Sequence, residues 1–364
     1  MAKQEVLLRA GWRYVKSIGG ADNIWYHNPW DLALRPDGVM AVLCRQQLDH
    51  AKIVLNTFDD EEYLGEFGEV GTRVGQIARP TSLAFGRDGL LYIADELTNR
   101  INAFTIDPEE VAADGGVQSI IRRGQIVQQS GKFVSHWGTT GRGDGELNGP
   151  SSIVFDPDDN LFVVDHRNSR IQKFTRDGRF LLNWGSPGTG DGEFNLPWGI
   201  TLDHEGNVYV ADWRNDRVQK FTGDGRFLAS FGSSGNDIGQ FNRPTSVAVD
   251  LDGDIYVADW KNDRVQVLAH DGRFVDVFHG AATLSKWAVA AGAAQSTEII
   301  KQRFMSEDVY LEKFFRRPVS VKLTDEGHVL VADNQRFRVQ VYQKEAYPSL
   351  RLMEVDLEEE PIVV

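Results

Sequence analysis

The stretch that most constrains this chain is "VYVADWRNDRVQKF" at residues 208–221, because it recurs 47 residues later as "IYVADWKNDRVQVL". One period earlier, "LFVVDHRNSRIQKF" begins at Leu161, and weaker copies begin at Met40, Leu91 and Val329. A period of roughly 20–50 residues indicates one supersecondary unit repeated along the chain. The sequence therefore predicts six such units.

Each copy contains four short runs of β-forming residues, separated by turns such as "DLDG" and "GDGR". Such runs and turns are typical of an antiparallel meander. Both faces of each run are apolar, so each small sheet must be covered on both sides, which predicts radial packing in a β-propeller. The sixth copy lacks a fourth strand, and "GWRYVKSIGG" at 11–20 has the pattern to supply it. We predict an all-β fold: a six-bladed β-propeller whose N-terminal strand closes the last blade.

Residues 1–364 are expected to form this one domain, with an acidic tail at 346–364. The predicted blades lie near 28–68, 79–138, 149–185, 196–232, 243–279, and 317–343 together with 11–20.

Two insertions interrupt the repeats. Residues 106–131 lengthen the connection between the third and fourth strands of the second blade, and they predict an extended excursion or a longer hairpin at the bottom face. Residues 280–316 carry apolar residues at helical spacing, which predicts a small helical insertion on the top face. This insertion is either a lid over the channel or a cap that docks a protein partner. Its end, "RRP" at 316–318, would bring two cations near the channel mouth.

Composition excludes some classes of function. The net charge of −14 argues against a nucleic-acid partner, because neutralising phosphates needs a basic surface. The single cysteine, Cys44, excludes an internal disulfide framework. No apolar run approaches the roughly 18 residues of a membrane span, and the N-terminus lacks a signal-peptide pattern. These features predict a cytoplasmic protein that does not enter membranes.

The segments "FNLPWGITLDHEGNVYVADWRNDRVQKF" and "FNRPTSVAVDLDGDIYVADWKNDRVQVL" resemble NHL repeats, and the resemblance covers nearly the whole chain. It implies the six-bladed propeller fold. NHL proteins include peptidyl-α-hydroxyglycine amidating lyases, antibiotic-opening lyases, RNA-binding modules and sensor domains, so the resemblance leaves the function open. In the amidating lyases, histidines directly after the proline that opens each first strand bind a catalytic zinc. This chain has no histidine at those positions.

Residues that recur in nearly every blade are interpreted as structural. An Asp ends the second strand of five blades, and an Arg follows five residues later. The Asp can accept backbone N–H groups and the Arg can bridge strands. These residues are Asp95, Asp165, Asp212, Asp259 and Asp333, with Arg100, Arg170, Arg217, Arg264 and Arg338.

Functional residues are expected where the blades differ. The loops before the first strand and after the second strand share one end of the channel, here called the top face. Trp30, Thr81, Ser151, Trp198, Thr245 and Val319 follow the opening proline, and Arg45, Glu96, His166, Trp213, Trp260 and Asn334 follow the end of the second strand. An aromatic rim with a few charged groups suits a small-molecule site, although the tryptophans could instead simply plug the channel.

Two substitutions occur in single blades. Asp31 stands where other blades have Ser or Gly, and Lys322 stands where they have Ala, Val or Thr. On the inner wall, the pair could act as a general base and a cation for an anionic substrate. A salt bridge that fills the channel is the equal alternative.

The leading hypothesis is a lyase or hydrolase that uses acid–base chemistry in a lidded pocket on the top face. Its predicted catalytic residues are Asp31, His166, Glu96 and Lys322. The predicted substrate-binding residues are Trp30, Arg45, Trp198, Trp213, Trp260, Asn334 and Trp287.

The alternatives are a non-catalytic interaction scaffold that recruits protein through residues 281–316 and, third, an RNA-binding module. No cofactor is predicted. His27 and His166, with Glu96 or Asp31, are weak candidates for a divalent metal site, because zinc needs three convergent ligands.

Overall fold

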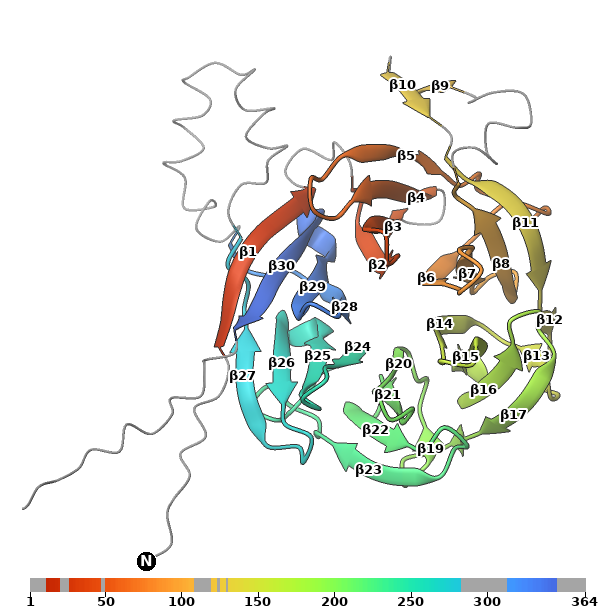
Figure 1. Ribbon diagram of the computed structural model, residues 1–364. Helices are drawn as coiled ribbons and strands as arrows, with labels where there is room; N and C mark the ends of the chain where they lie inside the picture. Colours follow the sequence, from red (N-terminus) through yellow and green to blue (C-terminus); the bar gives the residue numbers. More distant parts are fainter. Residues whose placement is uncertain are drawn as a thin grey trace, which may run out of the picture.

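The computed structural model describes residues 11–19, 26–46, 50–107, 119–122, 125–128, 130–282 and 313–345. Six four-stranded antiparallel sheets stand around a central axis as blades (Figure 1). In each blade the first strand lies nearest the axis and the fourth strand lies at the outer rim. The predicted all-β six-bladed propeller is confirmed.

Five blades follow the chain in order. The first blade is β2 (Pro29–Leu34), β3 (Val39–Gln46), β4 (His50–Thr57) and β5 (Tyr63–Phe67). The second is β6 (Pro80–Phe85), β7 (Leu91–Asp95), β8 (Arg100–Thr105) and β11 (Lys132–Trp137). The third is β14 (Pro150–Phe155), β15 (Asn160–Asp165), β16 (Arg170–Thr175) and β17 (Phe180–Trp184). The fourth is β20 (Ile200–Leu202), β21 (Val208–Asp212), β22 (Arg217–Phe221) and β23 (Phe227–Phe231). The fifth is β24 (Pro244–Val249), β25 (Ile255–Asp259), β26 (Arg264–Leu268) and β27 (Phe274–Phe278).

The sixth blade combines both ends of the described chain: β28 (Pro318–Leu323), β29 (His328–Asp333), β30 (Arg338–Glu345) and β1 (Gly11–Gly19). Three single-turn 3-10 helices directly follow second strands: η1 (His166–Asn168), η2 (Trp260–Asn262) and η3 (Asn334–Arg336). Short parallel pairs brace two inter-blade loops: β12 (Thr139–Thr140) with β13 (Glu146–Leu147), and β18 (Ser186–Pro187) with β19 (Glu193–Phe194). A hairpin of β9 (Ser119–Arg122) and β10 (Gln125–Gln128) lies within the insertion at 106–131.

The hydrophobic core is divided among the contacts between neighbouring blades. Each cluster of buried apolar residues joins two adjacent sheets. Between the fourth and fifth blades, for example, Tyr209 and Phe231 pack against Val247 and Val257. Fully burying such a side chain stabilises the fold by about 1.5–3 kcal/mol. The apolar faces that predicted the propeller are therefore the surfaces that hold the ring together.

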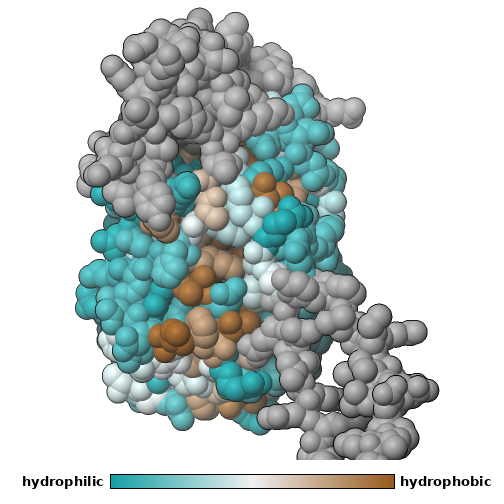
Figure 2. Space-filling view, turned by 90° about the vertical axis from the view of Figure 1, so that its left-hand side faces the viewer, coloured by the Kyte–Doolittle hydropathy of each residue, from teal (hydrophilic) through white to brown (hydrophobic). Residues whose placement is uncertain are grey.

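Every outer strand is interrupted by a β-bulge, at its second residue in four blades, at its third in β11 and at its fifth in β1. The residues skipped in the pairing register are Val15, Leu64, Val134, Leu181, Leu228 and Val275. Val134 is 47% exposed and Leu181 is 39% exposed. Figure 2 faces the side of the ring that carries β1 and β27, where small hydrophobic areas lie among a mostly hydrophilic surface. A bulge bends the strand and disrupts its free edge, which discourages pairing with a strand from another molecule.

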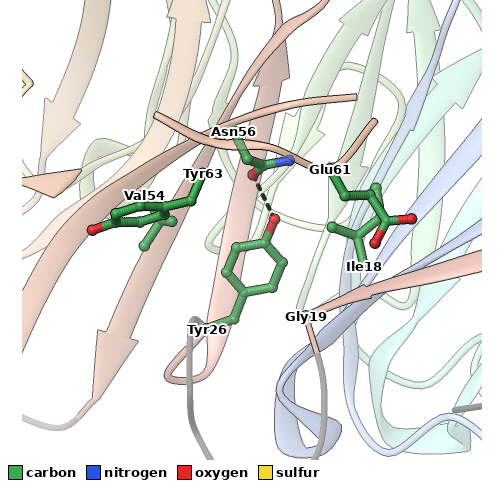
Figure 3. A pocket seen from close by; sticks show the side chains of 7 residues that line it. All are labelled: Ile18, Gly19, Tyr26, Val54, Asn56, Glu61 and Tyr63. Carbon is green, nitrogen blue, oxygen red and sulfur yellow. Dashed lines mark hydrogen bonds between the residues drawn. The ribbon is translucent and has the colours of Figure 1, made fainter. Parts of the chain in front are cut away.

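The N-terminal strand closes the ring, as predicted. β1 pairs antiparallel with β30, and Ile18 lies opposite Val339. At the seam with the first blade, Tyr26 is only 1% exposed and donates a hydrogen bond to Asn56 Oδ1 over 2.7 Å (Figure 3). Burial raises the pKa of Tyr26 well above its ordinary value. A cavity of about 10 Å³ beside this ring is about the size that one water molecule needs.

The recurring Asp and Arg residues have the structural role that the sequence indicates. Asp212 accepts the backbone N–H of Asn195 over 2.8 Å and pairs with Arg217 Nε over 3.0 Å. Arg217 Nη2 also donates to the carbonyls of Gly190 and Glu193 in the preceding loop. Equivalent contacts form at Asp165, Asp259 and Asp333. In the second blade, Arg100 instead donates to the carbonyl of Thr72.

Two predictions fall on residues outside the described parts of the chain. Residues 283–312, which hold most of the predicted helical insertion and Trp287, are not described, so the lid stays a prediction. The same holds for the tail at 346–364.

Candidate functional site

The top face brings several predicted residues together at the channel mouth. The indole rings of Trp30 and Trp198 come from opposite blades and meet edge to face with centroids 6.2 Å apart. His166 lies 4.9 Å and Trp213 lies 6.2 Å from the ring of Trp198. These aromatic side chains form one contiguous group.

Local backbone geometry places Trp198 there. Its blade begins regular pairing only at Ile200, because Gly199 lies against the backbone of the fifth blade. A Cβ atom at position 199 would stand 2.5 Å from the carbonyl oxygen of Thr245, so only glycine fits this close approach. The N–H of Trp198 donates to the carbonyl of Ala211 over 2.8 Å, which fixes the residue at the mouth.

Guanidinium groups stack on the tryptophans. Arg45 lies 4.6 Å from the ring centre of Trp30. Arg243 lies 4.9 Å and Arg214 lies 5.5 Å from that of Trp213. Arg317 lies 4.7 Å from that of Trp260. The side chains of these three tryptophans and of Trp198 are partly exposed, so their remaining surface can contact a ligand.

The charge at this mouth is opposite to the charge of the whole chain. The positions on either side of each opening proline, and the first two after the recurring Asp of each second strand (Cys44 takes its place in the first blade), hold one carboxylate, Glu96. They also hold the cations Arg45, Arg79, Arg167, Arg214, Arg243, Lys261 and Arg317. In the described part of the chain, no carboxylate pairs with the guanidinium of Arg214, Arg243 or Arg317. The net charge of the whole chain therefore does not describe the channel mouth, which is basic.

Glu96 forms ion pairs with this basic group, although only its Oε1 accepts a hydrogen bond among the described residues. The buried carboxylate lies 2.6 Å from Arg167 Nη2, 3.3 Å from Arg79 Nε and 3.7 Å from Arg45 Nη2. Burial lowers the pKa of Arg45 to about 10, which still leaves it charged at neutral pH. In this structure the predicted catalytic carboxylate holds three arginines in place.

His166 is a neutral imidazole with a defined tautomer. Its Nδ1 lies 2.9 Å from the carbonyl oxygen of Pro197, which can only accept, so Nδ1 carries the proton. Burial lowers the pKa of His166 below its ordinary value. Within the described residues its Nε2 has no hydrogen-bond partner, so a basic nitrogen is left at the mouth.

Asp31 and Lys322 form the ion pair that was one of the two alternatives. Lys322 Nζ lies 3.4 Å from Asp31 Oδ1. Asp31 also accepts hydrogen bonds from Ser320 Oγ over 2.7 Å, Ser82 Oγ over 2.8 Å and the N–H of Leu83 over 3.0 Å. The carboxylate thereby joins the sixth, first and second blades.

The uncharged polar residues of the rim also connect blades. Thr81 Oγ1 donates to the carbonyl of Pro150 over 2.8 Å, and Ser151 Oγ donates to that of Trp198 over 2.8 Å. Asn334 Nδ2 donates to the carbonyl of Pro29 over 3.1 Å. These side chains position the rim.

No three His, Cys, Asp or Glu side chains of the described residues come together as metal ligands. His27 lies in a loop before β2, and Cys44 is a buried thiol whose pKa burial raises to about 12. No helix within the described ranges is long and apolar enough to span a membrane.

Sequence reasoning missed the arginines that precede the opening prolines of the second and fifth blades, Arg79 and Arg243. It also missed Arg167 and Arg214. The signal was present, because Arg precedes that proline in three of the blades. The expected rim positions were the first residue after each opening proline and the first after each second strand, and these arginines lie directly beside those positions.

Comparison with known proteins agrees with this architecture. The signature of the NHL repeat matches residues 147–174, 194–221, 241–268 and 315–342. The chain therefore carries NHL repeats in its third to sixth blades. No curated protein matches it in sequence.

Solved structures similar to this NHL propeller include a streptogramin B lyase, with a TM-score of 0.53, 12% identity, and coverage of 94% of this chain and 100% of that one. A catalytically inactive virginiamycin B lyase variant from Staphylococcus aureus, with quinupristin, has a TM-score of 0.54 and 13% identity, covering 92% and 100%. The WD40 propeller domain of Doa1 has a TM-score of 0.50 and 13% identity, covering 92% and 98%. At these identities the likeness shows the fold alone.

Proposed function

We propose that this NHL propeller binds a small anionic molecule with a planar ring on its top face. The observation that carries the proposal is the pair of equivalent contacts between Arg243 and Trp213 and between Arg317 and Trp260. Each guanidinium has one face on an indole and keeps its N–H donors free of any carboxylate among the described residues. An arginine of this kind suits bidentate recognition of a carboxylate or phosphate.

The residue before the opening proline has a left-handed backbone in five of the six blades. Arg243 and Arg317 adopt left-handed conformations, with φ of 59° and 60°. In the third blade Gly149 occupies the same position with φ of 68°. A residue other than glycine costs about 1 kcal/mol or more in this region. Asn28 and Leu196 adopt the same conformation, with φ of 50° and 52°, so the backbone does not require arginine, and the case for these guanidinium groups rests on their contacts with the indoles.

The same hydrogen bond holds each of these backbones. The N–H of Arg243 donates to Asp216 Oδ1 and that of Arg317 donates to Asp263 Oδ1, both over 2.7 Å. The N–H of Gly149 donates to Asn99 Oδ1 over 2.6 Å. A change from Arg to Gly therefore preserves the local fold and removes only the cation.

The test measures quenching of tryptophan fluorescence by AMP as the probe, with ribose 5-phosphate and adenosine as partial probes. We expect saturable quenching by AMP at sub-millimolar concentration and at least tenfold weaker binding of either partial probe. The double variant Arg243→Gly, Arg317→Gly should lose AMP binding at least tenfold while its free energy of unfolding changes by less than about 1 kcal/mol.

The matched control is Arg226→Gln, which removes an exposed arginine from a turn on the bottom face. It should bind AMP as the wild type does. Binding by the double variant at wild-type affinity would contradict the proposal. Salt-sensitive binding of a single-stranded oligonucleotide without binding of AMP would favour the RNA-binding alternative.

Acid–base lyase or hydrolase chemistry is the second candidate, and the unprotonated Nε2 of His166 favours it. Mass spectrometry of a bound ligand after incubation tests it. Conversion by the wild type and none by His166→Ala would support an enzyme, whereas recovery of the unchanged ligand from both proteins would leave a binding protein.

A further inference from the structure

The central channel contains a cavity of about 630 Å³ below the aromatic group. The last residues of all six first strands line it, together with the turns between β24 and β25 and between β28 and β29. Leu251, in the first of these turns, is 72% exposed, so the cavity opens at the bottom face. Trp30 and Trp198 meet two residues above its upper wall. A cavity of this size suits a small molecule.

Its wall holds one cation deep inside. Lys322 stands where the other first strands have Ala33, Ala84, Val154, Thr201 and Ala248, all of which also line the cavity. The Lys322 side chain is 30% exposed, and its ion pair with Asp31 spans 3.4 Å. An ammonium carries three N–H donors, so at least two remain for a ligand.

The carboxylate of Asp31, beside this ammonium, has other hydrogen-bond donors. Asp31 accepts three other hydrogen bonds, from Ser320 Oγ, Ser82 Oγ and the Leu83 N–H. Asp31 is thus satisfied without Lys322, and the ammonium is available to an incoming anionic group.

The opening of the cavity has the opposite charge. Four carboxylates line it, and Lys344 Nζ lies 2.6 Å from Asp250 and 2.7 Å from Asp252. The remaining two, Asp325 and Glu326, are exposed and pair with no cation in the ranges that the structure describes. A ligand with only negative charge is repelled by the carboxylates at this opening. A ligand with only positive charge finds no free acceptor beside Lys322.

We propose that this cavity is a second binding site, independent of the top face, for a small molecule with a carboxylate at one end and a cation at the other, such as a free basic amino acid. Its carboxylate binds Lys322, and its distal cation binds Asp325 and Glu326. Lys322 is the last residue but one of β28, and Asp325 and Glu326 lie in the turn that follows this strand, so the cation and the two carboxylates belong to the same side of the cavity.

Isothermal titration calorimetry with L-arginine tests the proposal, and agmatine, which lacks the carboxylate, is the comparison probe. We expect saturable binding of L-arginine and at least tenfold weaker binding of agmatine. Lys322→Ala should weaken L-arginine binding at least tenfold without unfolding the protein, because alanine occupies this position in three other blades. Lys322→Arg should retain binding.

The matched control is Lys261→Ala, which removes an exposed lysine of the top face and should leave arginine binding unchanged. AMP quenching should in turn be unchanged in Lys322→Ala, so failure at one site can be distinguished from failure at the other. Absence of saturable arginine binding would overturn the proposal. Equal affinity of wild type and Lys322→Ala would also overturn it and would leave Lys322 only its ion pair with Asp31.

Discussion

Trp30 and Trp198 close the upper end of the channel by direct contact, although they stand on opposite blades. Their rings therefore meet across the mouth of the propeller with centroids 6.2 Å apart. Aromatic pairs in this geometry contribute about 0.5–1.5 kcal/mol beyond the area they bury.

A double-mutant cycle tests this contact. Trp30→Ala and Trp198→Ala should each destabilise the protein, and the double variant should be less destabilised than the sum by about 0.5–1.5 kcal/mol. Urea unfolding of the four proteins gives this coupling free energy. Strict additivity would mean that the rings meet without stabilising the fold.

Asp31→Asn should lower the free energy of unfolding by about 1–3 kcal/mol. Either orientation of the new amide points its NH₂ group at a group that can only donate, namely the N–H of Leu83 or the ammonium of Lys322. The additional change Lys322→Ala removes one of these conflicts and should restore part of the loss. Asp325→Asn, at an exposed turn, is the control, with a change of about 0.5 kcal/mol or less.

The pKa of His166 gives a pH-dependent stability. Burial lowers this pKa in the folded state, so the unfolded chain takes up the proton first as the pH falls. Stability from this group is complete above about pH 6.5 and is lost as the pH drops through the lower folded pKa. Urea unfolding of wild type and His166→Asn at pH 7.5 and pH 5.0 measures the difference. An equal pH response of both proteins would show that His166 does not contribute.

Arg264→Ala should be among the most destabilising changes. Arg264 pairs with Asp259 over 2.8 Å and donates to the carbonyls of Asp237 and Gln240. Removing it leaves Asp259 buried without its cation, at a cost of about 3–5 kcal/mol. Thermal and urea unfolding check this. Arg273→Ala breaks an exposed pair with Asp271 and should cost less than about 1 kcal/mol; equal losses would refute the structural role of Arg264.

The fold was predictable because one unit recurs at a nearly fixed period. Alignment of the repeats alone predicts that Trp30, Trp198, Trp213 and His166 lie at one end of the channel. Each blade must bury its apolar faces against its neighbours, so the same spacing of apolar residues recurs in the sequence of every blade.

The detailed site was less predictable, because it depends on distances across the ring. Contact between Trp30 and Trp198 follows from the channel width, which no short segment encodes. The partners of Asp31 are 289 residues away at Ser320 and 51 residues away at Ser82. Arg45 and the pair at 316–317 were expected near the mouth, whereas Arg214 and Arg243, which stack on Trp213, were missed because the net charge averages over the surface and hides a basic mouth.

The β-bulge in each of the six outer strands has a consequence for crowded solutions. A straight rim would act as a template on which a foreign segment could extend the sheet. Because all six outer strands are bulged, none offers a regular edge. Two propellers that collide can therefore touch through side chains but cannot form a continuous intermolecular β-sheet.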